Sequence, residues 1–309
     1  MTARLATLDR ASSESASETS SDRDPAWEAC RFLTASVLPV RVACNLRCPF
    51  CFSKSSISAL RREESLRRLD VSGYYRFARE RGATRLVITG GGEPLLRPDD
   101  VVELVRLGRA SFDEIACFTN GTYLTRELAE RLCDAGLSYL CYSRHAASDA
   151  DNEALMGPGA PRLAAFFDAA RPLAVRATCV MTKGGIDGPE AVWRYVAALR
   201  PYGVNELTFK HTYVAYESSV FQGSSEDRWA RSHQVEADPF EGTGEVMARL
   251  PWGPAIRKIE DIRVCYYREP TPAWEIENRI GRSTNLLSDG SVYASLEDRR
   301  SLLYRLGPC

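Results

Sequence analysis

The chain has 309 residues, of which 44% are hydrophobic and 26% charged, and its formal net charge is -1. This size and composition fit one large globular domain with an appendage, or a single barrel-like domain. The lack of any Lys/Arg run disfavours a nucleic-acid polymer as a partner. No apolar run approaches the roughly 20 residues of a membrane span, and no apolar signal core begins the chain. We therefore expect a soluble protein in the reducing cytoplasm, whose ten cysteines need not pair.

Three regions differ in composition. Residues 11–25 are rich in serine and acidic side chains and contain almost nothing that a core would bury, so we predict a disordered tail at residues 1–30. Residues 31–215 show alternating strand and helix patterns and are assigned to the main domain. Beyond about Tyr216 the periodicity weakens and proline is frequent, which predicts a loop-rich C-terminal capping region at residues 216–309. It includes a hairpin around Asp289-Gly290.

Strands and helices alternate through the main domain. Asp70 can cap a helix that ends at Gly82, and Thr125 can cap one that ends at Gly136. Such a series implies a parallel sheet with right-handed crossovers, either an open twisted sheet or a partial barrel, whose functional sites lie beyond the strand C-termini. The predicted strands are Ser36–Ala43, Arg85–Thr89, Glu114–Phe118, Tyr139–Ser143, Ala174–Met181 and Glu206–His211, and further helices begin near Pro98, Arg162 and Pro189.

Cys44, Cys48 and Cys51 lie within eight residues in the loop after the first predicted strand. This spacing can hold three irons of a cubane iron–sulfur cluster and leave the fourth iron open, which makes the cluster a site of reaction. A structural zinc site and an electron-transfer cluster are alternatives. Both normally have a fourth protein ligand nearby, and the next cysteine is Cys117.

The pattern resembles the radical S-adenosylmethionine (radical SAM) enzymes. Their signature is CxxxCxxC with an aromatic residue before the last cysteine, here Phe50. The turn Gly90-Gly-Gly-Glu-Pro94 after the second strand strengthens the resemblance, which covers about residues 36–215. It implies an α/β fold with a partial (βα)6 barrel. It also implies a [4Fe-4S] cluster and S-adenosylmethionine (SAM) as cofactors, and cleavage of SAM to a 5'-deoxyadenosyl radical.

The resemblance also implies roles for individual residues. The cluster ligands would be Cys44, Cys48 and Cys51, and the glycine-rich turn would meet the amino group of SAM. Phe50 would contact adenine mainly through its backbone. Three further polar residues near strand ends could reach SAM, and each could equally be a turn or capping residue. The predicted SAM-contacting residues are Phe50, Gly91, Gly92, Glu93, Asn120, Ser143 and Thr178.

Cys265 differs from the other cysteines outside the triplet, because it lies among polar and aromatic residues in the region expected to close the barrel mouth. A thiol there can return a hydrogen atom to a substrate carbon radical and invert the centre. The arrangement is similar to radical SAM epimerases, including the neomycin-type aminoglycoside epimerase. A plain core cysteine is the alternative. Cys117, Cys133, Cys141 and Cys179 are expected to be small buried side chains.

The sequence thus predicts a radical SAM epimerase of antibiotic biosynthesis that acts on a small polar molecule and takes electrons from a flavodoxin- or ferredoxin-type reductant. Seven acids against two bases between Tyr216 and Glu245 favour a cationic substrate such as an amino sugar or aminoglycoside, unless they form a solvated face. The alternatives are dehydration or rearrangement of an amino sugar or nucleotide, peptide modification, and a non-catalytic iron–sulfur electron-transfer protein.

Overall fold

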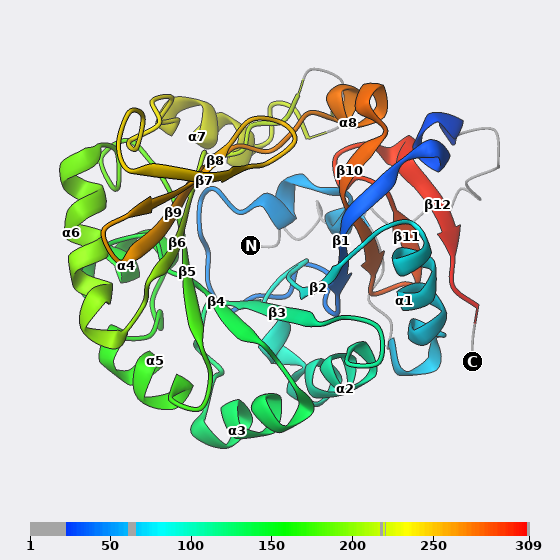
Figure 1. Cartoon of the computed structure of the whole chain (residues 1–309), viewed down its shortest axis with the longest axis horizontal. Helices are drawn as coiled ribbons and strands as arrows, with labels where there is room; N and C mark the ends of the chain where they lie inside the picture. Colours follow the sequence, from blue (N-terminus) through cyan, green and yellow to red (C-terminus); the bar gives the residue numbers. More distant parts are fainter. Residues whose placement is uncertain (1–22, 61–65, 217–218, 220, 308–309) are drawn as a thin grey trace, which may run out of the picture.

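The computed structural model describes residues 23–60, 66–216, 219 and 221–307. Figure 1 shows a strongly curled sheet with helices along its outer side. The strands are β1 (Arg31–Leu38), β2 (Arg85–Ile88), β3 (Glu114–Thr119), β4 (Tyr139–Ser143), β5 (Val175–Val180), β6 (Glu206–Lys210), β7 (Glu245–Arg249), β8 (Ala255–Ile259), β9 (Ile262–Tyr267), β10 (Ile280–Leu287), β11 (Ser291–Tyr293) and β12 (Leu302–Arg305).

Described helices lie between successive strands from β1 to β6 as predicted, except that a second helix, α4, which the sequence did not predict, precedes α5 between β4 and β5. Two more helices follow in the last third of the chain. Asp70 and Thr125 cap α1 and α3 through their side chains, and Gly136 ends α3 in the left-handed conformation. None of these helices is long and apolar enough to cross a membrane. The helices are α1 (Val71–Glu80), α2 (Pro98–Gly108), α3 (Arg126–Ala135), α4 (Asp149–Met156), α5 (Leu163–Ala170), α6 (Pro189–Leu199), α7 (Ser225–His233) and α8 (Pro272–Asn278).

All twelve strands belong to one sheet, in the order β12-β11-β10-β1-β2-β3-β4-β5-β6-β9-β8-β7. The pairs from β10 through β1–β6 to β9 are parallel, and the outer strands on both sides are antiparallel. The α/β fold with a partial barrel is therefore confirmed. The main core lies between this sheet and the surrounding helices, and includes Leu86, Leu132, Tyr142 and Phe209.

The first strand begins and ends about five residues earlier than the sequence predicted. It pairs with β10 from Arg31 and ends at Leu38, and residues 40–43 are not strand. Pro39 explains the end of the strand, because proline has no N–H to donate to a neighbouring strand. The consequence is a longer loop between the sheet and Cys44.

Two other expectations differ from the structure. Residues 25–29 form a short 3-10 helix rather than disordered tail, because Trp27 is fully buried and its indole Nε1 donates to Asp298 Oδ2 at 3.0 Å. Residues 1–22, the rest of the predicted tail, lie outside the described residues. The C-terminal third is more regular than predicted, because it contributes β7–β12 to the sheet. The hairpin at Asp289-Gly290 is confirmed as the β10–β11 turn.

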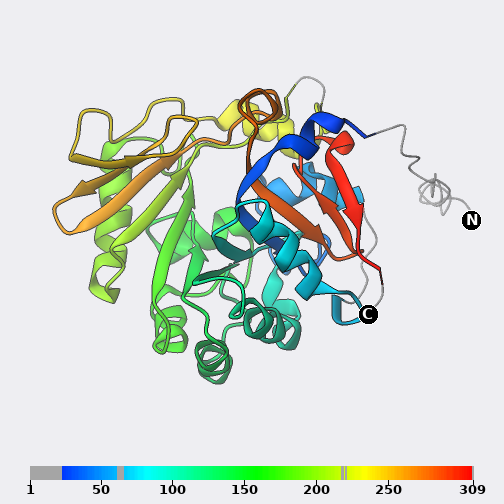
Figure 2. The same ribbon diagram turned by 45° about the vertical axis from the view of Figure 1, so that its right-hand side comes forward.

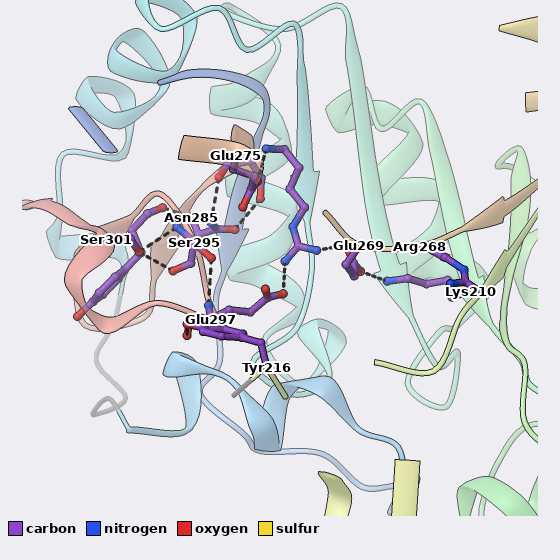
Figure 3. A network of polar contacts seen from close by, with 12 residues as sticks. Lys210, Tyr216, Arg268, Glu269, Glu275, Asn285, Ser295, Glu297 and Ser301 are labelled. Atoms are coloured by element: carbon purple, nitrogen blue, oxygen red, sulfur yellow. Dashed lines mark hydrogen bonds and ion pairs between the residues drawn. The ribbon is translucent and has the colours of Figure 1, made fainter. Parts of the chain in front are cut away.

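A chain of buried charges links β6 and the segment after β9 to β10, as Figure 3 shows. Lys210 Nζ lies 2.9 Å from Glu269 Oε1, and Glu269 also pairs with Arg282. Arg282 Nη2 in turn lies 3.0 Å from Glu297 Oε1, and the Glu297 side chain is only 2% exposed. Charges from four separate segments thus balance one another beside the barrel.

Replacing Arg282 with methionine should destabilise the fold, because it leaves the buried carboxylate of Glu297 without its cation and leaves the half-buried Glu269 with Lys210 alone. The expected loss is about 3–5 kcal/mol in the free energy of unfolding. Urea denaturation measures it. The matched control is Arg106→Met, which removes an exposed ion pair with Glu103 and should cost less than about 0.5 kcal/mol. Equal losses in the two variants would contradict this account.

The buried carboxyl group of Glu275 should make the free energy of unfolding depend on pH. Burial raises the pKa of this carboxyl to about 8, while its Oε1 accepts a hydrogen bond from the Arg282 backbone N–H at 2.7 Å. Between about pH 4.5 and 8 the folded protein holds a proton that the unfolded chain has lost, so stability falls as pH rises through this window. The slope is on the order of 1.4 kcal/mol per pH unit.

The measurement is urea denaturation at pH 5 and pH 8 for the wild type and for Glu275→Gln, whose amide mimics the protonated acid. Other groups titrate equally in both proteins, so the difference between them isolates Glu275. We expect the wild type to lose more stability than the variant on going to pH 8. An identical loss would mean that this carboxyl does not keep its proton in the folded state.

Candidate active site inside the curled sheet

The cysteine loop follows β1 and lies against the turns that follow β2 and β3. Cys44 is exposed, and Cys48 and Cys51 are partly exposed, so all three thiols are accessible to a ligand. Burial raises the pKa of Cys48 to about 12, and Cys51 and Cys44 raise it further by like-charge repulsion. Burial also raises the pKa of Cys44. Thiols this close lose their protons together only when a cationic group neutralises them, which suits an iron–sulfur cluster.

Among the described residues, no three His, Cys, Asp or Glu side chains are arranged to hold a single metal ion. A cubane cluster makes a different demand, because each of its irons takes one thiolate. The triplet, with its accessible and electrostatically coupled sulfurs, fits that demand. Cys44, Cys48 and Cys51 would then hold the cluster, which is the role that the sequence predicted for them.

The glycine-rich turn after β2 packs directly on the backbone that leads into the cysteine loop. A Cβ atom at Gly91 would overlap the carbonyl oxygens of Val40 and Arg41, and one at Gly92 would overlap the carbonyl oxygen of Ala43. This close packing requires glycine at both positions, whether or not a ligand is bound. A contact of this turn with SAM stays a prediction.

Glu93 is 2% exposed, and both oxygens of its carboxylate accept hydrogen bonds from the protein. Oε1 accepts hydrogen bonds from Thr119 Oγ1 at 2.7 Å and Leu95 N at 3.0 Å, and Oε2 accepts one from Asn120 N at 2.8 Å. Its backbone N–H donates to Ala43 O at 2.8 Å. Glu93 therefore joins the cysteine loop to the turn after β3. Its predicted contact with the SAM amino group remains untested.

Phe50 lies between two aromatic side chains. Its ring meets His145 edge-on at 4.7 Å between centroids and Trp229 of α7 at 5.8 Å. The His145 Nδ1 accepts from Val180 N at 3.0 Å, so a neutral ring carries its proton on Nε2. Burial, with Lys210 and Arg144, lowers the pKa of His145 to about 3. The Phe50 side chain is thus occupied by packing, which leaves its backbone for the predicted adenine contact.

One row of side chains crosses four parallel strands on the inner face of the curl. Ser143 is opposite Thr178, Thr178 is opposite Thr208, and Thr208 is opposite Cys265. Their neighbours Leu207, Phe209, Val264 and Tyr266 belong to the main core on the outer face. Alternation along a strand therefore turns the row inward. Ser143, Thr178 and Cys265, which the sequence singled out separately, share one surface.

The inner face also carries three residues that sequence analysis did not include among the site residues. They are Thr208, Lys210 and Tyr267. Lys210 is opposite Tyr267, and its Nζ lies 5.3 Å from that ring. Burial and Arg282 lower the pKa of Lys210 to about 8. A signal was present in the sequence, because polar residues alternate with apolar ones along Glu206–Lys210. A strand buried on both faces would be apolar throughout.

Three of the six described acids between Tyr216 and Glu245 form ion pairs. Glu226 lies 3.5 Å from Lys54, Asp227 lies 3.0 Å from Arg231, and Glu236 lies 3.0 Å from Arg268. Glu217 lies outside the described residues. These ion pairs weaken the field that favoured a cationic substrate, but Asp238, Glu241 and Glu245 have no ion pair among the described residues and still contribute to it.

The other cysteines divide by the face on which they lie. Cys117 and Cys179 are buried in the main core, as expected. Cys133 is exposed, contrary to the prediction, because α3 buries Leu128 and Leu132 and the next residue turns away from that face. Cys141 is buried on the inner face, among Val87, Ala116 and Tyr139. It is therefore a second thiol inside the curl, two residues nearer the start of β4 than Ser143.

A comparison with known families matches most of the main domain. The family model of the radical SAM superfamily matches residues 38–185. This segment contains the three cysteines, the glycine-rich turn and the strand-end residues of β3 to β5. Family members use a [4Fe-4S] cluster and SAM, and both cofactors are carried over to this domain with the superfamily.

Solved structures agree on the fold. SuiB of Streptococcus suis aligns with a TM-score of 0.55 at 14% identity, over 86% of this chain and 61% of that protein. A second structure of SuiB, described as bound to S-adenosylmethionine, aligns with a TM-score of 0.54 at 14% identity, over 86% of this chain and 61% of that chain. At this identity the likeness concerns the fold and not the reaction.

Curated relatives match a shorter stretch. A GTP 3',8-cyclase of Listeria monocytogenes is 39% identical over 97 residues, which is 31% of this chain and 28% of that enzyme. A probable GTP 3',8-cyclase of Methanothermobacter marburgensis is 35% identical over 108 residues, which is 35% of this chain and 33% of that enzyme. The chain thus spans about a third or less of the relatives that it matches.

Proposed function

With a radical SAM domain at residues 38–185 as the premise, we propose that this chain is an enzyme that inverts one carbon centre of a small hydroxylated molecule. Cys265 returns the hydrogen atom in this proposal. The observation that carries it is the register of β5, β6 and β9, which sets Cys265 opposite Thr208, and Thr208 opposite Thr178, on the inner face. An amino sugar, as in aminoglycosides, is the substrate class that we favour.

The inner row supports a hydroxylated substrate. Within the described part of the chain, no hydrogen bond is seen from the hydroxyls of Ser143, Thr178 or Thr208 to another protein group. Each hydroxyl can both donate and accept. Three such groups on neighbouring strands can bind the hydroxyls of a sugar ring, with strands about 4.8 Å apart. Cys265 continues the same row.

The environment of Cys265 supports a hydrogen-atom donor rather than a nucleophile. Burial, followed by the charge of Asp238, raises the pKa of this thiol to about 12. The sulfur therefore keeps its hydrogen at neutral pH, which atom transfer requires. A nucleophilic cysteine would need the opposite shift.

When bound, the cluster and SAM supply the 5'-deoxyadenosyl radical that removes one hydrogen atom from the substrate. The S–H bond of Cys265 then breaks, and a C–H bond forms on the opposite face of the same carbon. The sulfur radical of Cys265 regains one electron and one proton, and a flavodoxin- or ferredoxin-type protein supplies the electron.

The test uses anaerobically reconstituted protein, dithionite, SAM and a panel of aminoglycosides in deuterium oxide. We expect the wild type to form 5'-deoxyadenosine and to place one deuterium at an inverted carbon. Cys265→Ala should still form 5'-deoxyadenosine, because the cluster and SAM sites are intact, but should release less than about 1% of the inverted product.

The matched control is Cys141→Ala, which removes the other described thiol on the inner face and should keep inversion. Full inversion by Cys265→Ala would remove Cys265 from the reaction. A wild-type protein that binds a cluster but forms no 5'-deoxyadenosine would instead favour the non-catalytic electron-transfer alternative. Both outcomes are read by mass spectrometry of the small molecules.

A second candidate is rearrangement of a nucleotide, which the matches to GTP 3',8-cyclases favour. This reaction needs no thiol donor. We expect incubation of the wild type with GTP, SAM and dithionite to yield no cyclised product. Formation of such a product, in equal amounts by the wild type and Cys265→Ala, would replace the inversion proposal.

A further inference from the structure

Asn120 is a candidate regulator of the cluster rather than a ligand for SAM. It is the first residue after β3 and is 6% exposed. Its side-chain Nδ2 lies 3.6 Å from the sulfur of Cys44 and 3.1 Å from Asn45 Oδ1. A nitrogen-to-sulfur distance of this size is a hydrogen bond, because sulfur is larger than oxygen. The amide therefore contacts a residue expected to bind iron.

The hydrogen-bond network decides which end of the amide faces the sulfur. Asn120 Oδ1 accepts from Thr122 N at 2.9 Å, which only an oxygen can do. Flipping the amide would set two N–H donors against each other at Thr122 and leave Asn45 Oδ1 facing an oxygen. The N–H group must therefore point toward Cys44.

The backbone of Asn120 is fixed by the same carboxylate that supports the glycine-rich turn. Glu93 Oε2 accepts from Asn120 N at 2.8 Å, and Glu93 Oε1 accepts from Thr119 Oγ1 at 2.7 Å. Thr119 Oγ1 in turn accepts from Gly121 N at 2.9 Å. All three residues of this turn are thus held, so the amide is positioned in advance of any cluster.

Cys44 differs from its two partners in this respect. Its sulfur accepts a hydrogen bond from Leu46 N at 3.4 Å as well as the one from Asn120. For Cys48 and Cys51, no side-chain donor to the sulfur is seen among the described residues. A cluster held by the triplet would therefore receive an asymmetric set of hydrogen bonds, strongest at the first cysteine.

We propose that Asn120 is a positioning residue that tunes the reduction potential of the cluster through its hydrogen bond to Cys44. Hydrogen bonds to cysteine sulfur stabilise the extra negative charge of the reduced state and so raise the potential. Glu93 acts one contact further away, by holding Asn120. The inference rests on the proposed cluster, and it assigns to Asn120 a role that differs from the SAM contact predicted from the sequence.

The test compares wild type, Asn120→Ala and Asn120→Asp after reconstitution, without SAM or substrate. Asn120→Asp keeps the oxygen that accepts from Thr122 N but presents an acceptor to the sulfur. EPR-monitored redox titration measures the midpoint potential. We expect a fall in both variants, larger for aspartate. At a fixed potential, the ratio of reduced to oxidised cluster should drop by up to about tenfold, which corresponds to about 59 mV.

The control is Thr122→Ala, in the same turn. Its hydroxyl contacts Gly159 O at 3.3 Å, and only its backbone meets Asn120, so its potential should equal that of the wild type. Unchanged potentials in Asn120→Ala and Asn120→Asp, with iron content retained, would overturn the inference. A wild-type protein that takes up no cluster would refute the proposed function instead.

Discussion

The buried carboxylate of Glu93 is the constraint on which the candidate site depends. Its oxygens accept two hydrogen bonds from the end of β3, at Thr119 and Asn120, and one from Leu95 N, and its backbone N–H donates to the carbonyl of the residue before Cys44. Because this one residue joins the segments that follow β1, β2 and β3, the cysteine loop has a defined position although most of it lacks regular structure. The glycines before Glu93 permit this, since any Cβ atom there would overlap the loop backbone.

Charge is arranged differently at the two ends of the curled sheet. At the N-terminal ends of the strands, Arg176 lies 3.0 Å from Glu206 and 3.7 Å from Glu114, and both acids have further arginine partners. Beside the opposite ends, Lys210, Glu269, Arg282 and Glu297 form the buried chain of Figure 3. Between these two charged layers lies the row of uncharged hydroxyls and the thiol of Cys265. That middle layer suits radical chemistry, because its groups neither carry charge nor titrate near neutral pH.

The C-terminal third is the region in which the structure differs most from the sequence prediction. Figure 2 shows the β7–β8 hairpin projecting from one side of the sheet and β10–β12 on the other. Sequence analysis predicted loops there, because prolines are frequent in the connections between the strands and because β9 and β10 pair with strands far earlier in the chain. A short strand whose partners are 50 to 250 residues away leaves little local pattern for its detection.

The sequence by itself determined the parallel β1–β6 core, the helix caps and the three-cysteine loop, because each rests on local spacing or on a short-range hydrogen bond. Only the tertiary structure decided that Cys265, Thr208 and Thr178 share one row and that Lys210 and Arg282 share Glu269. It also decided that the amide of Asn120 faces Cys44. The physical reason is that strand register and burial depend on pairing between distant segments. The free energy of this pairing depends on both segments together and cannot be read from either one alone.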